Sequence, residues 1–311
     1  MAQVSPIEVR AEAAIIDPAR ARYEPPSLRK AVHRLSRMPV GVASGVILLT
    51  IILVAVAAPA VAPYDPYDSE IVNRLKPPVW EAGGSWTYIL GTDKIGRDTL
   101  SRLIYGARVS LSAGFLAMII SVLIGVPLGI VAGYYGRLVD TVISTVINIQ
   151  LTFPFVLLAL TVVAVLGPSF SNVILVLGIA SWTVYARVIR SEVLKIRELD
   201  YVLASRALGV STLRIVARHV FPNTVNTVIV LSTVQIARFI IAEAFLSFLG
   251  LGIQAPTPSW GSMLGDSREF MYDRWWLPTL PGLAIFITTL SINLCGDTLR
   301  DWLDPYRRNV V

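Results

Sequence analysis

Six long stretches with almost no charged side chains constrain this chain more than any other feature of its sequence. They cover residues 39–62, 109–135, 141–166, 168–186, 224–251 and 277–295. A helix that crosses a membrane needs about 20 mainly apolar residues, whereas strands of a soluble core are much shorter. The stretches also lack the alternation of apolar and polar residues that marks an outer-membrane barrel. The sequence therefore predicts an all-α integral membrane protein with about six transmembrane helices.

Composition supports this class and argues against others. Only 15% of the residues are charged and 54% are hydrophobic, while a soluble domain carries about 25% charged residues. A disordered chain would need low hydrophobicity and high charge. Cys295 is the only cysteine, and His33 and His219 are the only histidines. This argues against a disulfide scaffold and against a protein-built zinc site, so we expect no metal or cofactor bound by this chain.

The distribution of basic residues predicts the direction of the spans. Lys and Arg gather in the N-terminal segment, in the connection 187–223 and in the C-terminal tail. Cytoplasmic loops carry an excess of these residues, and six crossings place all three segments on one side, so we expect both termini in the cytoplasm. The predicted external loop 63–108 holds six basic and six acidic residues. The net charge of +6 reflects the cytoplasmic bias, and no nucleic-acid partner is needed to explain it.

The segments follow in a simple order. We expect a loosely ordered N-terminus (1–26), a juxtamembrane amphipathic helix (27–38), the first span (39–62), an external loop (63–108), a transmembrane core (109–298) and a cytoplasmic tail (299–311). The core includes a cytoplasmic connection (187–223) and an external loop (252–276). Segment 27–38 can also be a solvated run of charges. The first span can also be a signal peptide cleaved near Ala62, although it is longer than usual for one.

Small residues recur every four positions along the second span. They are Ala113, Ala117, Ser121, Gly125, Gly129 and Gly133. Such a stripe lets helix backbones approach closely in lipid, so we expect Gly125, Gly129 and Gly133 to pack against another helix. A glycine-lined pore is the alternative. Pro127 and Pro154 predict local bends in the second and third spans.

Two of the predicted loops have distinctive compositions or residue spacings that a flexible linker would not require. The connection 187–223 has apolar residues at helical spacing on both sides of Gly209, which predicts two helical pieces with a turn between them. Such a segment is suited to docking into the groove of another protein. The external loop 252–276 is rich in proline and aromatic residues. It indicates either membrane-interface anchors or a docking surface for an external partner.

Two groups of residues resemble a nucleotide-binding site and a catalytic cluster, but each departs from the pattern that such a site requires. Residues 91–98 resemble a phosphate-binding loop, but Arg97 stands at the lysine position and Asp98 at the Ser/Thr position. Asp297, Asp301 and Asp304 have the spacing of a solvated helical cap. No catalytic triad or dyad stands out, so we expect neither ATP binding nor catalysis by this chain.

The fifth span contains two charges. Arg238 lies near its middle and Glu243 follows five residues later. A charge at this depth normally faces the interior of the bundle or a water-filled path. We therefore expect Arg238 and Glu243 to line a translocation path in which Arg238 meets a substrate carboxylate. The alternative is a structural pair of Arg238 with Glu243 or with a neighbouring subunit.

The cytoplasmic stretch 203–222 resembles the loop by which permeases of ABC importers contact their ATPases. Ala204, Gly209 and Pro222 match the family pattern, while Leu203 and Ser205 stand where the family has glutamate and alanine. Residues 90–102, 243–261 and 293–305 resemble one branch, the C-type permease of dipeptide, oligopeptide and nickel importers. The resemblance covers residues 28–308. It assigns the ATPase coupling to Leu203, Ala204, Ser205, Ala207, Leu208 and Gly209.

This resemblance implies a permease of the type I ABC importer kind in a bacterial inner membrane. It implies four partners, namely a homologous second permease, two cytoplasmic ATPase domains that bind ATP and Mg, and an extracytoplasmic substrate-binding protein. Peptide is the expected cargo, while glutathione, haem and nickel stay open. An ATP-independent carrier or channel is the main alternative, and a membrane-embedded enzyme is the third.

Overall fold

The computed structural model describes residues 39–303, and every regular element in that range is a helix. The chain divides into two units, residues 1–39 and 40–311, and the helices considered below belong to the second. The predicted amphipathic helix at 27–38, the segment 1–26 and the tail beyond residue 303 lie outside the described residues.

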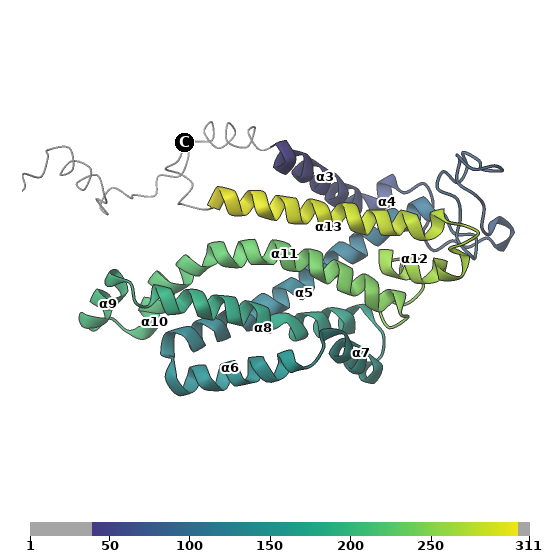
Figure 1. Ribbon diagram of the computed structural model, residues 1–311. Coiled ribbons are helices and arrows are strands. Elements are labelled where there is room, and N and C mark those ends of the chain that lie inside the picture. Colours follow the sequence, from purple (N-terminus) through teal and green to yellow (C-terminus); the bar gives the residue numbers. More distant parts are fainter. Residues whose placement is uncertain (1–38, 304–311) are drawn as a thin grey trace, which may run out of the picture. The chain divides into compact units, whose positions relative to one another are not determined.

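Five helical segments are long and apolar enough to cross a membrane (Figure 1): α3 (Pro39–Val56), α5 (Thr99–Tyr135), α8 (Phe170–Ile196), the segment Thr212–Phe248, which includes α11 (Phe221–Phe248), and α13 (Trp276–Leu303). Helices α6 (Arg137–Thr152) and α7 (Phe155–Leu166), bent by 84° relative to each other, are long and apolar enough only when taken together. The shorter elements are α4 (Ala58–Val61), η2 (Ile71–Asn73), α9 (Asp200–Ala207), α10 (Thr212–Ile215), η3 (Val216–Val220), α12 (Trp260–Ser267) and η4 (Arg268–Phe270). The predicted all-α membrane fold is confirmed.

The third predicted span is not one continuous helix. It breaks at Phe153 and Pro154, whose backbone conformations are not helical, with ψ angles of 126° and 125°. Proline lacks an N–H and disfavours helical conformation in the residue before it, which explains a full break where only a local bend was expected. At Pro127, by contrast, α5 continues without interruption.

Two other boundaries differ from the sequence-based ones. Helix α5 begins at Thr99, so Arg102 and Arg108 belong to a helix instead of the predicted loop 63–108. Helix α8 continues to Ile196, ten residues beyond the predicted end of the fourth span. Ile189, Val193 and Ile196 are buried in this extension, because their spacing of three to four residues keeps them on one face.

Helices α5 and α8 pack side by side and run in parallel. Ser121 Oγ donates to the carbonyl of Gly178 at 2.7 Å. A Cβ atom added to Gly129 would lie 2.6 Å from the carbonyl oxygen of Ala186, and one added to Gly133 would lie 2.8 Å from Val193 Cβ. Contacts therefore advance along both helices in the same direction. Because the chain leaves α5 at one end and enters α8 at the other, α6 and α7 together carry it across once.

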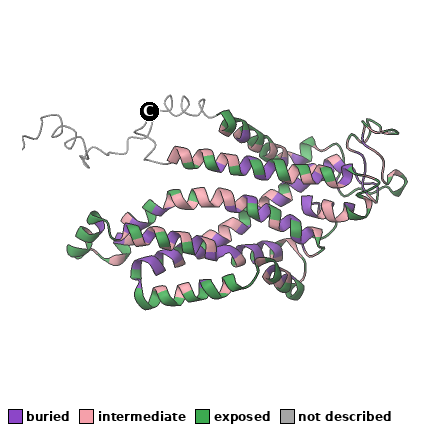
Figure 2. Ribbon diagram, in the orientation of Figure 1, coloured by how far each residue is buried: buried purple, intermediate pink, exposed green. Residues whose placement is uncertain are grey.

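The remaining helices alternate in direction around this pair. Ser110 of α5 contacts Glu243 of α11, while Gly114 packs against Ile240, so these helices are antiparallel. Helix α13 packs on α11 and α3 packs on α13. Burial is greatest along α5 and α8, and α3 is largely exposed (Figure 2). Within the described chain this gives six crossings, with the beginning of α3 and the end of α13 at the same end as α9 (Figure 1).

Candidate functional site

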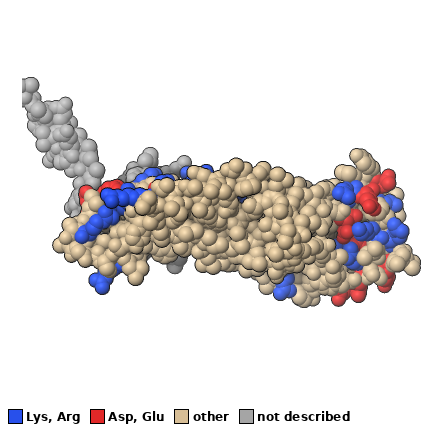
Figure 3. All heavy atoms as spheres, turned by 90° about the horizontal axis from the view of Figure 1, so that it is seen from below, with Lys and Arg blue, Asp and Glu red and all other residues tan. Residues whose placement is uncertain are grey.

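Charged side chains gather at the two ends of the described helices and leave a mainly uncharged band between them, with a basic group at its edge (Figure 3). Residues 187–223, at the α9 end, include seven basic and three acidic residues. Residues 63–98, which precede α5 at the α12 end, include four basic and six acidic residues. The α9 end is therefore the more basic of the two.

At the α9 end, residues 197–211 form a turn-containing segment, here called the elbow. Helix α9 is anchored by the side chain of Val202, which is fully buried in a cluster with Tyr134, Ile196 and Ile215. The remaining face of this segment is exposed, and Leu203 and Leu208 on it are 40% and 83% exposed. Ala204, Ala207 and Gly209 are exposed as well, and Ser205 is half-buried. Five of the six predicted coupling residues are thus exposed, and α9, which carries most of them, is anchored through the buried side chain of Val202.

The turn of the elbow lies at Gly209. Its N–H donates to Arg206 O at 3.0 Å, and the N–H of Val210 donates to Ser205 O at 3.1 Å. The φ angle of Gly209 is +74°, and a Cβ atom there would meet no other atom within 4 Å. Glycine is needed here because residues with a Cβ rarely adopt this conformation. The requirement for glycine therefore comes from the backbone conformation and not from a clash between a side chain and the rest of the chain.

Polar contacts attach the elbow and the adjoining end of α8 to several helices. Arg197 donates to the carbonyl of Gly133 at 2.9 Å, near the end of α5. Arg190 forms a two-point ion pair with Asp140 of α6, with Nη2 at 2.6 Å from Oδ2. The guanidinium of Arg206 lies 5.4 Å from the ring centre of Tyr134. A displacement of the elbow must therefore act on α5, α6 and α8 together.

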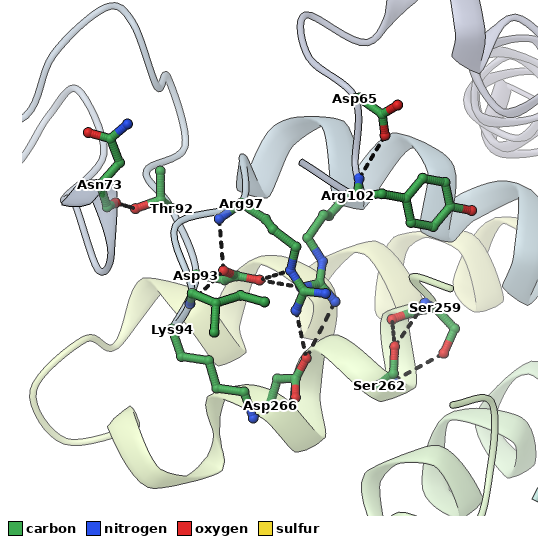
Figure 4. Close-up of polar contacts among 12 residues, drawn as sticks. Asp65, Asn73, Thr92, Asp93, Lys94, Arg97, Arg102, Ser259, Ser262 and Asp266 are labelled. Atoms are coloured by element: carbon green, nitrogen blue, oxygen red, sulfur yellow. Dashed lines mark hydrogen bonds and ion pairs between the residues drawn. The ribbon is translucent and has the colours of Figure 1, made fainter. Parts of the chain in front are cut away.

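At the α12 end, five charged side chains form a partly buried cluster, in which Lys94 and Asp266 keep 41% and 29% of their side-chain surface exposed (Figure 4). Asp93 pairs with Arg97 at 2.7 Å and also with Arg102. Asp266 of α12 pairs with Lys94 at 2.9 Å, and both arginines lie 3.4 Å from it. Arg97 and Arg102 are only 4% and 2% exposed. Removing one partner of a buried ion pair leaves an uncompensated charge, so this cluster fixes the loop before α5 on α12.

This cluster explains the segment that resembles a phosphate-binding loop. Asp93 Oδ1 accepts from the N–H groups of Ile95 and Arg97, at 3.0 and 2.9 Å. Asp98 accepts from the N–H of Ser101 at 2.7 Å and so caps α5. Both carboxylates occupy the N–H groups that a phosphate would need, and the segment has a structural role at this junction.

Glu243 lies at a second junction, between α11, α5 and α12. It is fully buried and accepts from Ser110 Oγ at 3.0 Å and from Ser247 Oγ at 2.8 Å. Ser110 Oγ in turn accepts from the N–H of Trp260 at 3.2 Å. A Cβ atom on Gly261 would lie 2.7 Å from Ala244 O, so the start of α12 is pressed directly onto α11.

The structure does not bring Arg238 and Glu243 together. Arg238 is exposed on α11, and its guanidinium donates to Gln235 of the same helix at 3.3 Å. Ile241 and Phe245 share this exposed face, at 52% and 43% exposure. Of the interpretations of Arg238, the pair with Glu243 is therefore not what the structure contains. A path-lining role and a contact with a neighbouring subunit both fit the exposed position.

Sequence reasoning missed the charged cluster at the α12 end. The i, i+4 spacing of Asp93 and Arg97 is a signal that could have indicated a pair. Asp266 gives no such signal, because 169 residues separate it from Arg97. In the part of the chain that the structure describes, no three His, Cys, Asp or Glu side chains converge as metal ligands would.

Comparisons with known proteins agree with this arrangement. Residues 125–309 match the family described as "Binding-protein-dependent transport system inner membrane component". Residues 27–78 match the family described as "N-terminal TM domain of oligopeptide transport permease C". The first match covers more than half of the chain.

Two curated relatives are similar along most of their length. The dipeptide transport system permease protein DppC of Escherichia coli (strain K12) is 46% identical over 273 residues, which cover 88% of this chain and 91% of that protein. The di/tripeptide transport system permease protein DppC of Pseudomonas aeruginosa (strain UCBPP-PA14) is 43% identical over 264 residues, covering 85% and 87%.

Solved structures share the fold at low sequence identity. An inward-facing structure of the MetNI methionine ABC transporter aligns with a TM-score of 0.52 and 19% identity, covering 65% of this chain and 96% of that chain. An amino acid ABC transporter with histidines aligns with a TM-score of 0.51 and 18% identity, covering 65% and 94%.

Proposed function

The chain belongs to the family of binding-protein-dependent transport system inner membrane components, as a permease subunit of an ABC importer, and we propose that it forms half of a translocation path for short peptides. In this proposal the chain is not itself catalytic. ATP and Mg are bound by partner ATPase subunits, and the chain converts their movement into a change of its helix bundle.

The elbow is the observation that carries this proposal. Leu203 and Leu208 offer an apolar surface to a partner, while Val202 beneath them is buried among residues of α5 and α8. A partner that grips the exposed face therefore moves the ends of these helices, because packed elements shift as units instead of deforming continuously. Such a lever needs no catalytic group in this chain.

The proposed complex has one partner surface at each end. Two cytoplasmic ATPase domains would serve this chain and a homologous second permease, one at each elbow. The basic character of the α9 end favours a cytoplasmic position for it, which would put both termini in the cytoplasm of a bacterium and the protein in its inner membrane. An extracytoplasmic binding protein would then deliver cargo at the α12 end.

Peptide is the cargo we propose, because two relatives with more than 40% identity are named as dipeptide or di/tripeptide permeases. Arg238, on the exposed face of α11, is the candidate to meet a peptide carboxylate. A charge-assisted hydrogen bond from guanidinium to carboxylate is among the stronger polar contacts.

Site-directed cross-linking tests the coupling. In a Cys295→Ala background, a cysteine placed at Leu208 should cross-link to an ATPase subunit in the assembled complex. A cysteine at Trp86, which is 81% exposed at the other end, is the matched control and should not. Peptide-stimulated ATP hydrolysis by the same complex is the second expected result. Peptide uptake into vesicles that lack the ATPase subunits would contradict the proposal and favour an ATP-independent carrier or channel.

A further inference from the structure

Helix α3 is loosely attached to the described helices, and grooves open on both sides of it. Near its beginning, Ser44 Oγ lies 3.4 Å from Cys295 Sγ of α13. At its other end, Ala55 is buried, as is Ala58 of α4. A groove of about 480 Å³ lies between α3, α5, α11 and α13, and one of about 360 Å³ lies between α3, α5, α12 and α13.

The larger groove has a single charged residue in its lining. Arg108 is exposed, and within residues 39–303 it has no hydrogen bond or ion pair. The rest of the lining is mainly aliphatic and aromatic, including Ile52, Phe115 and Ile236. A guanidinium without a partner beside an apolar groove favours a ligand that carries one anionic group on an apolar body.

The direction of the helices places Arg108 at one mouth of the groove. Helix α3 runs toward the α12 end and α5 runs away from it (Figure 1). Among the lining residues, Arg108 is therefore level with Val56, while Phe115 lies deeper. Seven residues of helix separate Arg108 from Phe115, a rise of about 10 Å. This length fits within one leaflet, whose hydrocarbon is about 15 Å deep, half of the ~30 Å core.

We propose that this groove binds one acyl chain of a phospholipid from the leaflet at the α12 end, with the phosphate bound by Arg108. A guanidinium binds phosphate oxygens with charge-assisted hydrogen bonds, and a long arginine side chain near the end of a span extends to the membrane interface. The bilayer supplies phosphates at this depth, whereas a covering subunit would have to bring an acidic side chain to the same point.

Peptide cargo fits this groove less well. A peptide carries backbone N–H and C=O groups, and burying them against an aliphatic lining without partners costs free energy. An acyl chain has no such groups. The proposal concerns the lipid neighbours of α3 and does not depend on which solute the importer carries.

Native mass spectrometry of the assembled complex tests the site. The complex is reconstituted with phosphatidylethanolamine and phosphatidylglycerol, transferred to detergent, and the retained phospholipid is counted. Arg108→Gln should reduce this retention about fivefold, the effect of one basic residue near a lipid surface, and Arg108→Lys should restore part of it. Arg74→Gln is the control, because Arg74 is exposed at the same end but lies outside the groove. Equal retention in Arg108→Gln and wild type would overturn the proposal.

A second variant keeps Arg108 and fills the groove instead. Ser112 lines the groove, so Ser112→Phe should also lower the retention of phospholipid. If Arg108→Gln does not assemble, the comparison of Ser112→Phe with wild type tests the proposal instead. Cys295 provides a reporter in the lining: bound phospholipid should slow its reaction with a membrane-permeant maleimide, and added dipeptide should not. Protection by dipeptide alone, or a cross-link from Phe115 to another subunit, would show a different occupant and refute the lipid site.

Discussion

Substitution of Gly209 tests the elbow as a coupling lever. The residue has φ of +74°, and a Cβ atom would meet nothing within 4 Å. A side chain here therefore costs only backbone strain within the chain, about 1–2 kcal/mol for most residues and less for Asn and Asp. Gly209→Asp should fold and assemble, but it places a carboxylate beside Leu208, the most exposed apolar residue of the elbow.

The effect of Gly209→Asp should appear in coupling. Burying an unpaired carboxylate in a protein interface costs several kcal/mol, and each 1.4 kcal/mol is a factor of ten in binding. We expect peptide uptake per ATP hydrolysed to fall at least about tenfold in proteoliposomes. Gly209→Asn has a similar shape without the charge and should retain most of the coupling, while Gly209→Ala reports the strain alone.

Gly167, between α7 and α8, provides a matched control. Its φ is +85°, a Cβ atom there also meets nothing within 4 Å, and it lies at the opposite end of α8 from the elbow. Gly167→Asp should leave the ratio of uptake to hydrolysis unchanged. Normal coupling by Gly209→Asp, or an equal loss in Gly167→Asp, would refute the assignment of the lever to the elbow.

Three further substitutions test other parts of the molecule. Gly129→Val forces α5 from α8 and should destabilise the bundle by about 1–3 kcal/mol, the usual effect of overpacking. Gly282→Val, at a position with open space, is its control, and thermal unfolding of the purified complex in detergent measures both. Asp266→Asn removes a partner of Arg102 and should cost about 1–2 kcal/mol by the same assay, less than a fully buried pair because Asp266 is 29% exposed. Arg238→Ala should weaken peptide uptake with hydrolysis retained, and Arg238→Lys should restore it in part; unchanged uptake in both would end the path-lining role.

The sequence predicted the elements whose signals are local. Long apolar stretches indicate the spans because a membrane-crossing helix must satisfy its backbone internally. Gly209 marked the turn of the elbow because few other residues adopt a positive φ. The spacing of Gly125, Gly129 and Gly133 indicated a close helix contact, and the structure places these residues against α8.

Features that depend on distant parts of the chain were not predictable in this way. Hydropathy shows that residues 141–166 are apolar, but the 84° break near Pro154 depends on whether neighbouring helices favour a bend. The partner of Arg102 on α12 is Asp266, 164 residues away. The five-residue spacing of Arg238 and Glu243 already places them on different faces of a helix, but the partner of Glu243 needed the structure, because Ser110 lies on another helix.

Helix α5 connects the two ends of the molecule. At one end Asp98 caps it, and Arg102 ties its first turn to Asp93 and to α12. At the other end Gly133 accepts a hydrogen bond from Arg197 of the elbow. Its 37 residues span about 55 Å, well beyond the ~30 Å hydrocarbon core. If α5 moves as one rod, a displacement of the elbow must either carry α12 with it or break the cluster around Asp266, whereas bending at Pro127 would leave that cluster unchanged. If α5 transmits movement, Asp266→Asn should reduce the stimulation of ATP hydrolysis by the binding protein; if the cluster only stabilises the fold, hydrolysis should stay fully stimulated below the unfolding temperature of that variant.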